Sequence, residues 1–158
     1  MKLLLTLLLS TSLSTFALEL DFWSSESFCT ESPNVQNRNG VFYLPNQQEP
    51  FTGENLCVYT NGQYHSKGNI LNGLKDGKWT WWFSNGQIDI EGNYKDGKKY
   101  GKWTEFDDGQ KLEEGNFKDD IRDGKYTWWY WNGQKKLEVN FKDDILDGKY
   151  TSWYESGQ

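Results

Sequence analysis

Short segments that alternate aromatic and polar residues recur from residue 51 to the end of the chain, and pairs of turn-forming residues separate them. Between Gly77 and Gly97 these segments are rich in Trp, Thr, Tyr and Ile, and nothing in them favours a helix. Asn-Gly and Asp-Gly pairs reach positive φ at low cost and close tight hairpins. The pattern therefore predicts one β-hairpin per unit, followed by a turn into the next unit.

Two series of glycines give the length of the unit. A period of 20 to 50 residues is typical of one supersecondary unit that has been copied and stacked. We interpret the first series, which precedes glutamine at steps of 23 or 24 residues, as hairpin turns and the second series as strand starts. The predicted fold is all-β, an elongated single sheet of stacked hairpins. The first series is Gly62, Gly86, Gly109, Gly133 and Gly157, and the second is Gly53, Gly77, Gly101, Gly124 and Gly148.

Aromatic residues occupy two fixed positions in each unit, the second and the fifth after the leading glycine. Because these positions differ by an odd number, they point to opposite faces of a pleated strand, so both faces should carry an aromatic column unless a bulge intervenes. A row of lysines, with Lys78 as an example, should lie in solvent and balance nearby carboxylates. The second position holds Trp79, Trp103, Tyr126 and Tyr150, and the fifth holds Val58, Trp82, Phe106, Trp129 and Trp153.

The third unit is irregular, because Gly101 and Gly109 are eight residues apart where the matching glycines elsewhere are nine apart. Glu105 and Asp107 stand where neighbouring units carry aromatic residues. A one-residue loss moves the following side chains to the other face of a strand. We therefore expect a local bulge or bend near Asp107 and Asp108, arising either by drift or as a functional kink.

The unit GKWTWWFSNGQIDIEGNYKDG, which begins at Gly77, resembles the bacterial variant of the MORN repeat, and weaker copies begin at Gly101, Gly124 and Gly148. The resemblance covers residues 51–158 as about five repeats, the last of them incomplete, and leaves residues 18–50 as a non-repetitive N-terminal cap. It implies a groove-like or twisted sheet that serves as a scaffold for protein association, sometimes at membranes. Some bacterial relatives are labelled antitoxin-like, a role that normally operates in the cytosol.

Residues 1–17 have the pattern of a cleaved secretory signal, with one lysine, a leucine-rich run and the small residue Ala17 at the end. The apolar run is too short to span a bilayer, so no transmembrane segment is expected after cleavage. The mature protein should be exported, to the periplasm, the cell surface or the medium. An oxidising compartment favours a disulfide between Cys29 and Cys57, whereas a reducing one would leave two free thiols.

The charge balance argues against two classes of partner. The net charge is −6, and removal of residues 1–17 makes it −7 because Lys2 is lost. Nucleic acid is repelled by such a surface, and no basic cluster attracts anionic lipid headgroups. A protein partner is expected, a glycan is possible in principle, and nucleic acid is not expected.

No constellation for catalysis is visible. The chain has a single histidine, His65, and no catalytic triad, spaced metal ligands or phosphate-binding loop accompanies it. Asp119, Asp120 and Asp123 form an acidic cluster that turn formation already explains. We therefore predict a protein that is not an enzyme and that needs no metal or cofactor.

Two functions remain, a protein-binding scaffold and a glycan or cell-wall binder. Aromatic rows can stack on sugars or hold cations, although packing between repeats also explains them. The chain reaches residue 158 on a hairpin turn, which would leave an unpaired sheet edge, and either a longer protein or strand addition by a partner would account for it. The candidate surface comprises Trp81, Trp82, Trp128, Trp129, Trp131 and Trp153.

Overall fold

The computed structural model describes residues 29–157, and the all-β prediction is confirmed, because these residues form thirteen strands and no helix. The predicted signal at residues 1–17 lies outside the described part of the chain. The strands are β1 (Cys29–Ser32), β2 (Gln36–Arg38), β3 (Val41–Tyr43), β4 (Gly53–Tyr59), β5 (Tyr64–Leu71), β6 (Leu74–Trp82), β7 (Ile88–Lys95), β8 (Lys98–Asp107), β9 (Gln110–Lys118), β10 (Ile121–Trp129), β11 (Lys135–Lys142), β12 (Ile145–Leu146) and β13 (Thr151–Ser152).

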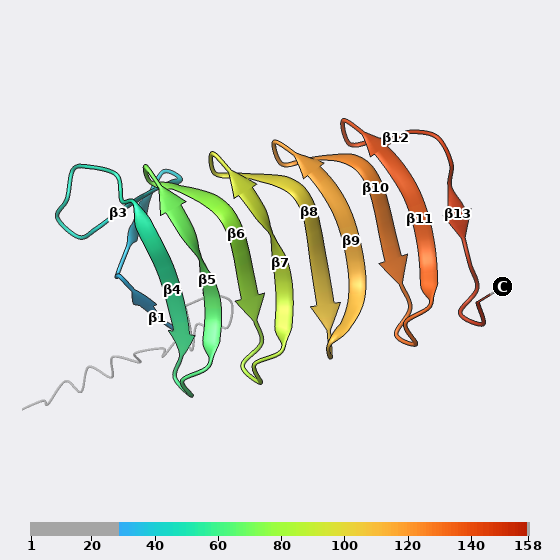
Figure 1. Ribbon diagram of the computed structural model, residues 1–158, viewed down its shortest axis with the longest axis horizontal. Helices are drawn as coiled ribbons and strands as arrows, with labels where there is room; N and C mark the ends of the chain where they lie inside the picture. Colours follow the sequence, from blue (N-terminus) through green and yellow to red (C-terminus); the bar gives the residue numbers. More distant parts are fainter. Residues whose placement is uncertain (1–28, 158) are drawn as a thin grey trace, which may run out of the picture.

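Eleven of these strands form one open, antiparallel sheet that is elongated across its strands (Figure 1). From β4 to β11 each strand pairs with the next one in the sequence, which makes four consecutive hairpins. Strand β1 lies beside β4 at one edge, and β12 and β13 both pair with β11 at the other. Strands β2 and β3 form a separate two-stranded sheet.

Four glycines of the first series, Gly62, Gly86, Gly109 and Gly133, lie in hairpin turns, and Gly157 lies at a turn after β13; the φ angles of all five are between 76° and 86°. At the opposite ends of the hairpins, paired residues such as Asn72 and Gly73 also adopt positive φ. Only glycine reaches these angles without strain, and Asn and Asp tolerate them better than other residues. The turn chemistry read from the sequence therefore sets both ends of every unit.

The second glycine series does not mark strand starts except at Gly53, so that expectation is wrong. Gly77, Gly101 and Gly124 lie inside β6, β8 and β10, where their φ angles are 67°, 70° and 110°. Beside Gly77 the pairing of β5 with β6 shifts register between Lys67 and Asn69. A residue with positive φ inside a strand produces a bulge and bends the strand, so these glycines curve the sheet.

The short third unit keeps its side chains on the expected faces, so the predicted flip is also wrong. Each of the four hairpins carries the same register shift near the turn, and in β8–β9 it lies between Glu105 and Phe106. The turn is one residue shorter in this unit, because Asp107 pairs with Gln110 across a two-residue loop. A shorter loop absorbs the deletion without altering the register beyond it.

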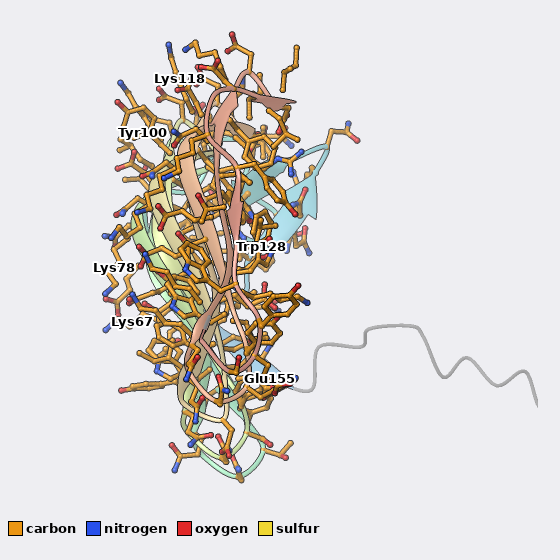
Figure 2. All side chains as sticks on the ribbon, turned by 90° about the vertical axis from the view of Figure 1, so that its right-hand side faces the viewer. Lys67, Lys78, Tyr100, Lys118, Trp128 and Glu155 are labelled. Carbon is orange, nitrogen blue, oxygen red and sulfur yellow. The ribbon has the colours of Figure 1, made fainter. Side chains whose placement is uncertain are left out.

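The two faces of the large sheet differ in chemistry, and we call them the aromatic face and the charged face. Lys67 and Lys78 project from the charged face, whereas Trp128 and the small sheet of β2 and β3 lie on the other side (Figure 2). Val35 of the N-terminal segment packs there against Ile70 and Trp79. This segment therefore covers the first end of the aromatic face.

The charged face is held by ion pairs that repeat from hairpin to hairpin, and Lys78, Lys102 and Lys125 of the predicted lysine row take part in them. The paired side chains are partly exposed, and buried threonines such as Thr104 lie between them and the aromatic residues of that face. The pairs are Lys67 with Glu54 at 3.2 Å, Lys78 with Glu91 at 2.8 Å, Lys102 with Glu114 at 3.0 Å and Lys125 with Glu138 at 2.8 Å.

Candidate functional site on the aromatic face

A continuous chain of aromatic rings runs across the aromatic face, from β6 to β11. Ring centroids along it are 4.5 to 6.4 Å apart, and most contacts between neighbouring strands are edge-to-face. Such arrangements match the quadrupoles of the rings. The rings belong to Trp79, Trp81, Tyr94, Trp103, Phe117, Tyr126, Trp128 and Phe141.

The rings at the second position after the leading glycine, which we call the position-two rings, are buried because a third series of glycines lies beneath them. A Cβ atom at Gly68, Gly92 or Gly115 would overlap the ring of the following strand, namely Trp79, Trp103 or Tyr126. None of these three glycines has a positive φ, so it is space that glycine provides here. Our sequence reasoning missed this role, although the Gly-Asn pairs at steps of 24 and 23 residues were a visible signal.

The indole nitrogens of the buried tryptophans are also satisfied beside these glycines. Trp79 Nε1 donates a hydrogen bond to the carbonyl of Asn69 at 3.0 Å, and Trp103 Nε1 donates to the carbonyl of Asn93 at 3.1 Å. A buried donor without a partner is costly. The position-two rings therefore have a structural role, as the packing interpretation of the sequence expects.

Cationic side chains lie against rings along this chain, at the same period as the repeat. Lys75 Nζ lies 4.5 Å from the Trp79 ring centroid, and Lys99 Nζ lies 4.3 Å from that of Trp103. The Arg122 guanidinium lies 4.1 Å from the Phe141 ring centroid. These distances are typical of cation–π contacts. The aromatic face thus already holds cations against its rings.

Two opposed glutamates interrupt the apolar residues of this face. Glu105 on β8 and Glu113 on β9 are direct cross-strand partners. The corresponding pair in the preceding hairpin is Trp81 with Ile90, and in the following hairpin it is Trp128 with Leu137. The acidic pair therefore lies in one row with apolar pairs on both sides.

The surroundings of Glu105 raise its pKa and so favour the protonated acid. Partial burial raises the pKa of Glu105, and Glu113, Asp89 and Asp107 raise it further, against the opposing charge of Lys99. Burial also raises the pKa of Asp89, with Asp107 adding to it. This region of the face is consequently rich in negative charge that the fold does not neutralise fully.

Glu113 is held in place by a tyrosine hydroxyl. Tyr126 Oη donates a hydrogen bond to Glu113 Oε1 at 2.8 Å. Burial and this carboxylate together raise the pKa of Tyr126 far above its ordinary value, so the hydroxyl keeps its proton. Beside the two carboxylates lies a shallow pocket of about 80 Å³, lined by Ile90, Lys99, Trp103, Thr104, Glu105, Glu113, Phe117 and Tyr126.

The six candidate tryptophans do not form one row. Trp81 and Trp128 belong to the aromatic face, where each packs partly exposed beside a position-two ring. Trp82, Trp129 and Trp153 occupy the other aromatic column, and Trp131 is 64% exposed at a hairpin turn. A partner could reach all six only by contacting more than one surface.

The last unit departs from the pattern because Val139 stands where the earlier hairpins have Gly68, Gly92 or Gly115. The valine side chain is buried and fills the space over which the next position-two ring would lie. That ring belongs to Tyr150, which is 62% exposed. A pocket of about 350 Å³ is lined there by Tyr130, Lys136, Leu137, Tyr150, Ser152, Trp153 and Tyr154.

The predicted disulfide stays a prediction, because the Cys29 side chain lies outside the described residues. Cys57 is buried on β4, and the backbone of Cys29 is opposite Tyr59 on the neighbouring strand. His65 packs edge-to-face on Tyr59 at 5.0 Å, and burial lowers its pKa. Within residues 29–157 no group of His, Cys, Asp and Glu is arranged to hold a metal ion.

Comparison with known families gives a match for this architecture. The model of the MORN repeat variant matches residues 75–96, 122–143 and 146–158. These three segments are similar to the MORN repeat variant. The first two matched segments include most of hairpins β6–β7 and β10–β11 of the large sheet, and the hairpin β8–β9, which carries the acidic pair and the shortened turn, lies between them.

MORN repeats generally mediate binding to proteins or membranes, and the family is generally non-enzymatic. No curated protein matches the chain. No helix among the described residues is long and apolar enough to cross a membrane.

Proposed function

We propose that this protein is an exported, non-enzymatic scaffold that binds a protein partner across its aromatic face. The observation that carries the proposal is the contrast between the two faces. Charged-face side chains pair with one another, whereas Trp81 and Trp128 remain partly exposed in an aromatic layer that, among residues 29–157, the N-terminal segment covers at one end. Exposed aromatic patches with a polar rim are typical of binding surfaces.

Site-specific photo-crosslinking tests which face is used. A photoreactive amino acid replaces Trp81 or Trp128 on the aromatic face, and Trp82 or Trp129 on the charged face serves as the matched control. In cells that produce the full chain, we expect one protein to crosslink to both aromatic-face positions and to neither control. Mass spectrometry identifies it, and the purified pair is then tested by titration. Crosslinks from the charged face alone would refute the proposal.

Export is supported by the pattern of residues 1–17 and by the two cysteines, Cys29 and Cys57. We expect the mature chain to begin near residue 18 in an exported fraction. Non-reducing electrophoresis should show a mobility shift that the Cys57→Ser variant lacks. N-terminal sequencing that finds residues 1–17 intact in the cytosol would contradict this part of the proposal.

A glycan-binding function is a second candidate, favoured by the aromatic pocket of the last unit. Tyr150 and Tyr154 are 62% and 79% exposed there, beside Trp153 and Ser152. Exposed rings stack on sugar faces, and hydroxyls fix their orientation. Tryptophan fluorescence titrated with cell-wall fragments should respond, and Tyr154→Ala should weaken the response while Tyr100→Ala, on another exposed tyrosine, should not. An unchanged fluorescence signal at high fragment concentration would exclude glycan binding.

A further inference from the structure

We infer that the aromatic face selects an extended protein segment with an internal lysine or arginine, whose cationic group binds at the pair formed by Glu105 and Glu113. The inference rests on the proposed protein-binding function and names the partner chemistry of the same face. It is carried by the pocket, by the aromatic rings around it and by a charge that the fold leaves uncompensated.

The acidic pair brings the fold no stability that an apolar pair would not. Glu105 and Glu113 are directly opposed, and like charges in that arrangement destabilise a sheet. The same row accommodates Trp81 with Ile90 and Trp128 with Leu137 in adjacent hairpins. A position that carries a stability cost in an otherwise apolar row is a candidate for a functional role.

The charge complementarity is specific to this position. Asp89, Asp107 and Glu113 act on Glu105 as negative charges, and Lys99 is the opposing cation among them. On the charged face, by contrast, each central glutamate has a lysine within 3.2 Å. The electrostatic attraction for a cation of the partner is therefore strongest at the acidic pair of the aromatic face.

The neighbouring rings supply a second attraction for a cation. Trp103, Phe117 and Tyr126 line the pocket beside the carboxylates. The protein itself places Lys99 Nζ 4.3 Å from the Trp103 ring centroid and 5.0 Å from that of Phe117. A partner cation that takes the place of Lys99 Nζ uses the same combination of ring face and carboxylate.

The spacing of the apolar rings fixes the form of the partner. Trp81 on β6 and Trp128 on β10 lie in one row, four strand spacings apart, with the acidic pair between them. Four spacings amount to about 19 Å, the length of roughly six residues of extended chain. Because Glu105 and Glu113 lie on β8 and β9, the midpoint of the pair is about 12 Å from Trp81 and about 7 Å from Trp128. Alternate residues of an extended segment share a face, so the segment carries a basic residue with one apolar residue about four positions away over Trp81 and another about two positions away over Trp128.

An anionic membrane is the less suitable occupant of this face. The acidic pair lies at its centre and the chain has a net charge of −6, so anionic headgroups are repelled. Vesicles that contain anionic lipid are included in the test, because membrane binding through this face would overturn the inference.

The test uses the full chain and three seven-residue probe peptides with a phenylalanine at each end and lysine, glutamine or glutamate at the fifth position, on the same face as the phenylalanines. Indole N–H signals of Trp81 and Trp128 in NMR spectra report binding at low salt. We expect the lysine peptide to bind about tenfold more tightly than the glutamine peptide, as one desolvated ion pair allows, and the glutamate peptide to bind most weakly.

The variants Glu105→Gln and Glu113→Gln should each weaken lysine-peptide binding about tenfold and leave glutamine-peptide binding unchanged. Glu91→Gln, on the charged face of the preceding hairpin, is the matched control and should change the affinity for neither peptide. Equal binding of the three peptides, no binding of any of them, or an equal loss in the control would overturn the inference.

The crosslinking experiment distinguishes failure of the cation-binding inference from failure of the proposed protein-binding function. If Trp81 and Trp128 crosslink to a protein but Glu105→Gln does not weaken that complex, the aromatic face is a docking surface without cation selectivity. If the crosslinks come from the charged face, the docking surface itself is wrong. Signals that shift with anionic vesicles and with no peptide identify a membrane-binding face instead.

Discussion

The two faces of the sheet are built from alternate residues of the same strands, yet they are held together by different forces. On the aromatic face, Trp103 lies over Gly92 and is 6% exposed, with its indole N–H bonded to the backbone. On the charged face of the same strand, Phe106 is only partly buried, and Lys102 pairs with Glu114. One face therefore supplies most of the apolar burial in this thin protein, and the other supplies partly exposed ion pairs.

Removing one ring from each face should give the largest contrast. We expect Trp103→Ala to lower the free energy of unfolding by about 3–5 kcal/mol, because it leaves a cavity between Tyr94 and Phe117. Phe106→Ala, three residues further along β8, should cost less than about 2 kcal/mol. Urea denaturation measures both. Equal losses in the free energy of unfolding would show that the two faces contribute equally to stability.

Adding one carbon beneath a ring should be the next largest effect. Gly115→Ala places a Cβ against the Tyr126 ring and should cost about 1–3 kcal/mol through overpacking. In a Tyr126→Ala background the same substitution should be neutral or slightly stabilising, since alanine suits a strand better than glycine. The double-mutant cycle, followed by urea denaturation, measures this. A similar cost in both backgrounds would rule out the ring as the cause.

Neutralising one carboxylate of the acidic pair should raise stability. The folded pKa of Glu105 lies above the ordinary value of 4.5, so the folded state binds the proton more tightly than the unfolded chain. The carboxylate then costs stability at pH 7, and the cost disappears as the pH falls through the folded pKa. Glu105→Gln should therefore stabilise the protein by up to about 1 kcal/mol at pH 7, and by nothing below pH 4.5.

Thermal unfolding at pH 7 and pH 4 measures this gain. A variant that is more stable yet binds the lysine peptide less well would show that Glu105 is retained for binding. A loss of stability at pH 7 would contradict the assigned environment.

Neutralising the glutamate next to that pair should have the smallest effect and the opposite sign. Glu114 faces the charged side, where burial raises its pKa but hydrogen bonds from Lys111 and Lys102 outweigh burial and lower it. A lowered folded pKa gives stability above the unfolded pKa, which is lost as the pH falls through the folded value. Glu114→Gln should cost less than about 1 kcal/mol at pH 7.

That cost should shrink further in 1 M salt, because partly exposed ion pairs are screened. Chemical denaturation with urea at low and high salt provides the measurement. A loss that does not depend on salt would indicate that Glu114 acts through packing.

Much of the architecture follows from local chemistry and was predictable. Asn-Gly and Asp-Gly pairs fix the turns, and the period-two alternation of Trp79, Thr80 and Trp81 fixes which side chains share a face. The lysine row and its glutamate partners also follow from the repeat, because equivalent positions align from one hairpin to the next. These features depend only on residues that are close in the chain or equivalent between units.

The candidate site was harder to predict, because it depends on which residues meet across strands. Glu105 was visible as an irregular residue in a short unit, but its partner Glu113 becomes apparent only when the register is known. The expected flip of side chains in that unit was wrong because a turn can absorb a deletion that a strand cannot. The six tryptophans that the sequence analysis grouped as one surface lie on two faces of the sheet and at a hairpin turn, because side chains alternate along each strand.

The repeat in the sequence therefore determined the all-β fold, the order of the hairpins and the chemistry of the two faces, since turn preference and strand alternation are local properties. Tertiary structure alone decided that Gly68, Gly92 and Gly115 make room for rings of the next strand, and that two carboxylates are opposed in an apolar row. Both depend on the register between strands, which is set by the packing of the whole sheet.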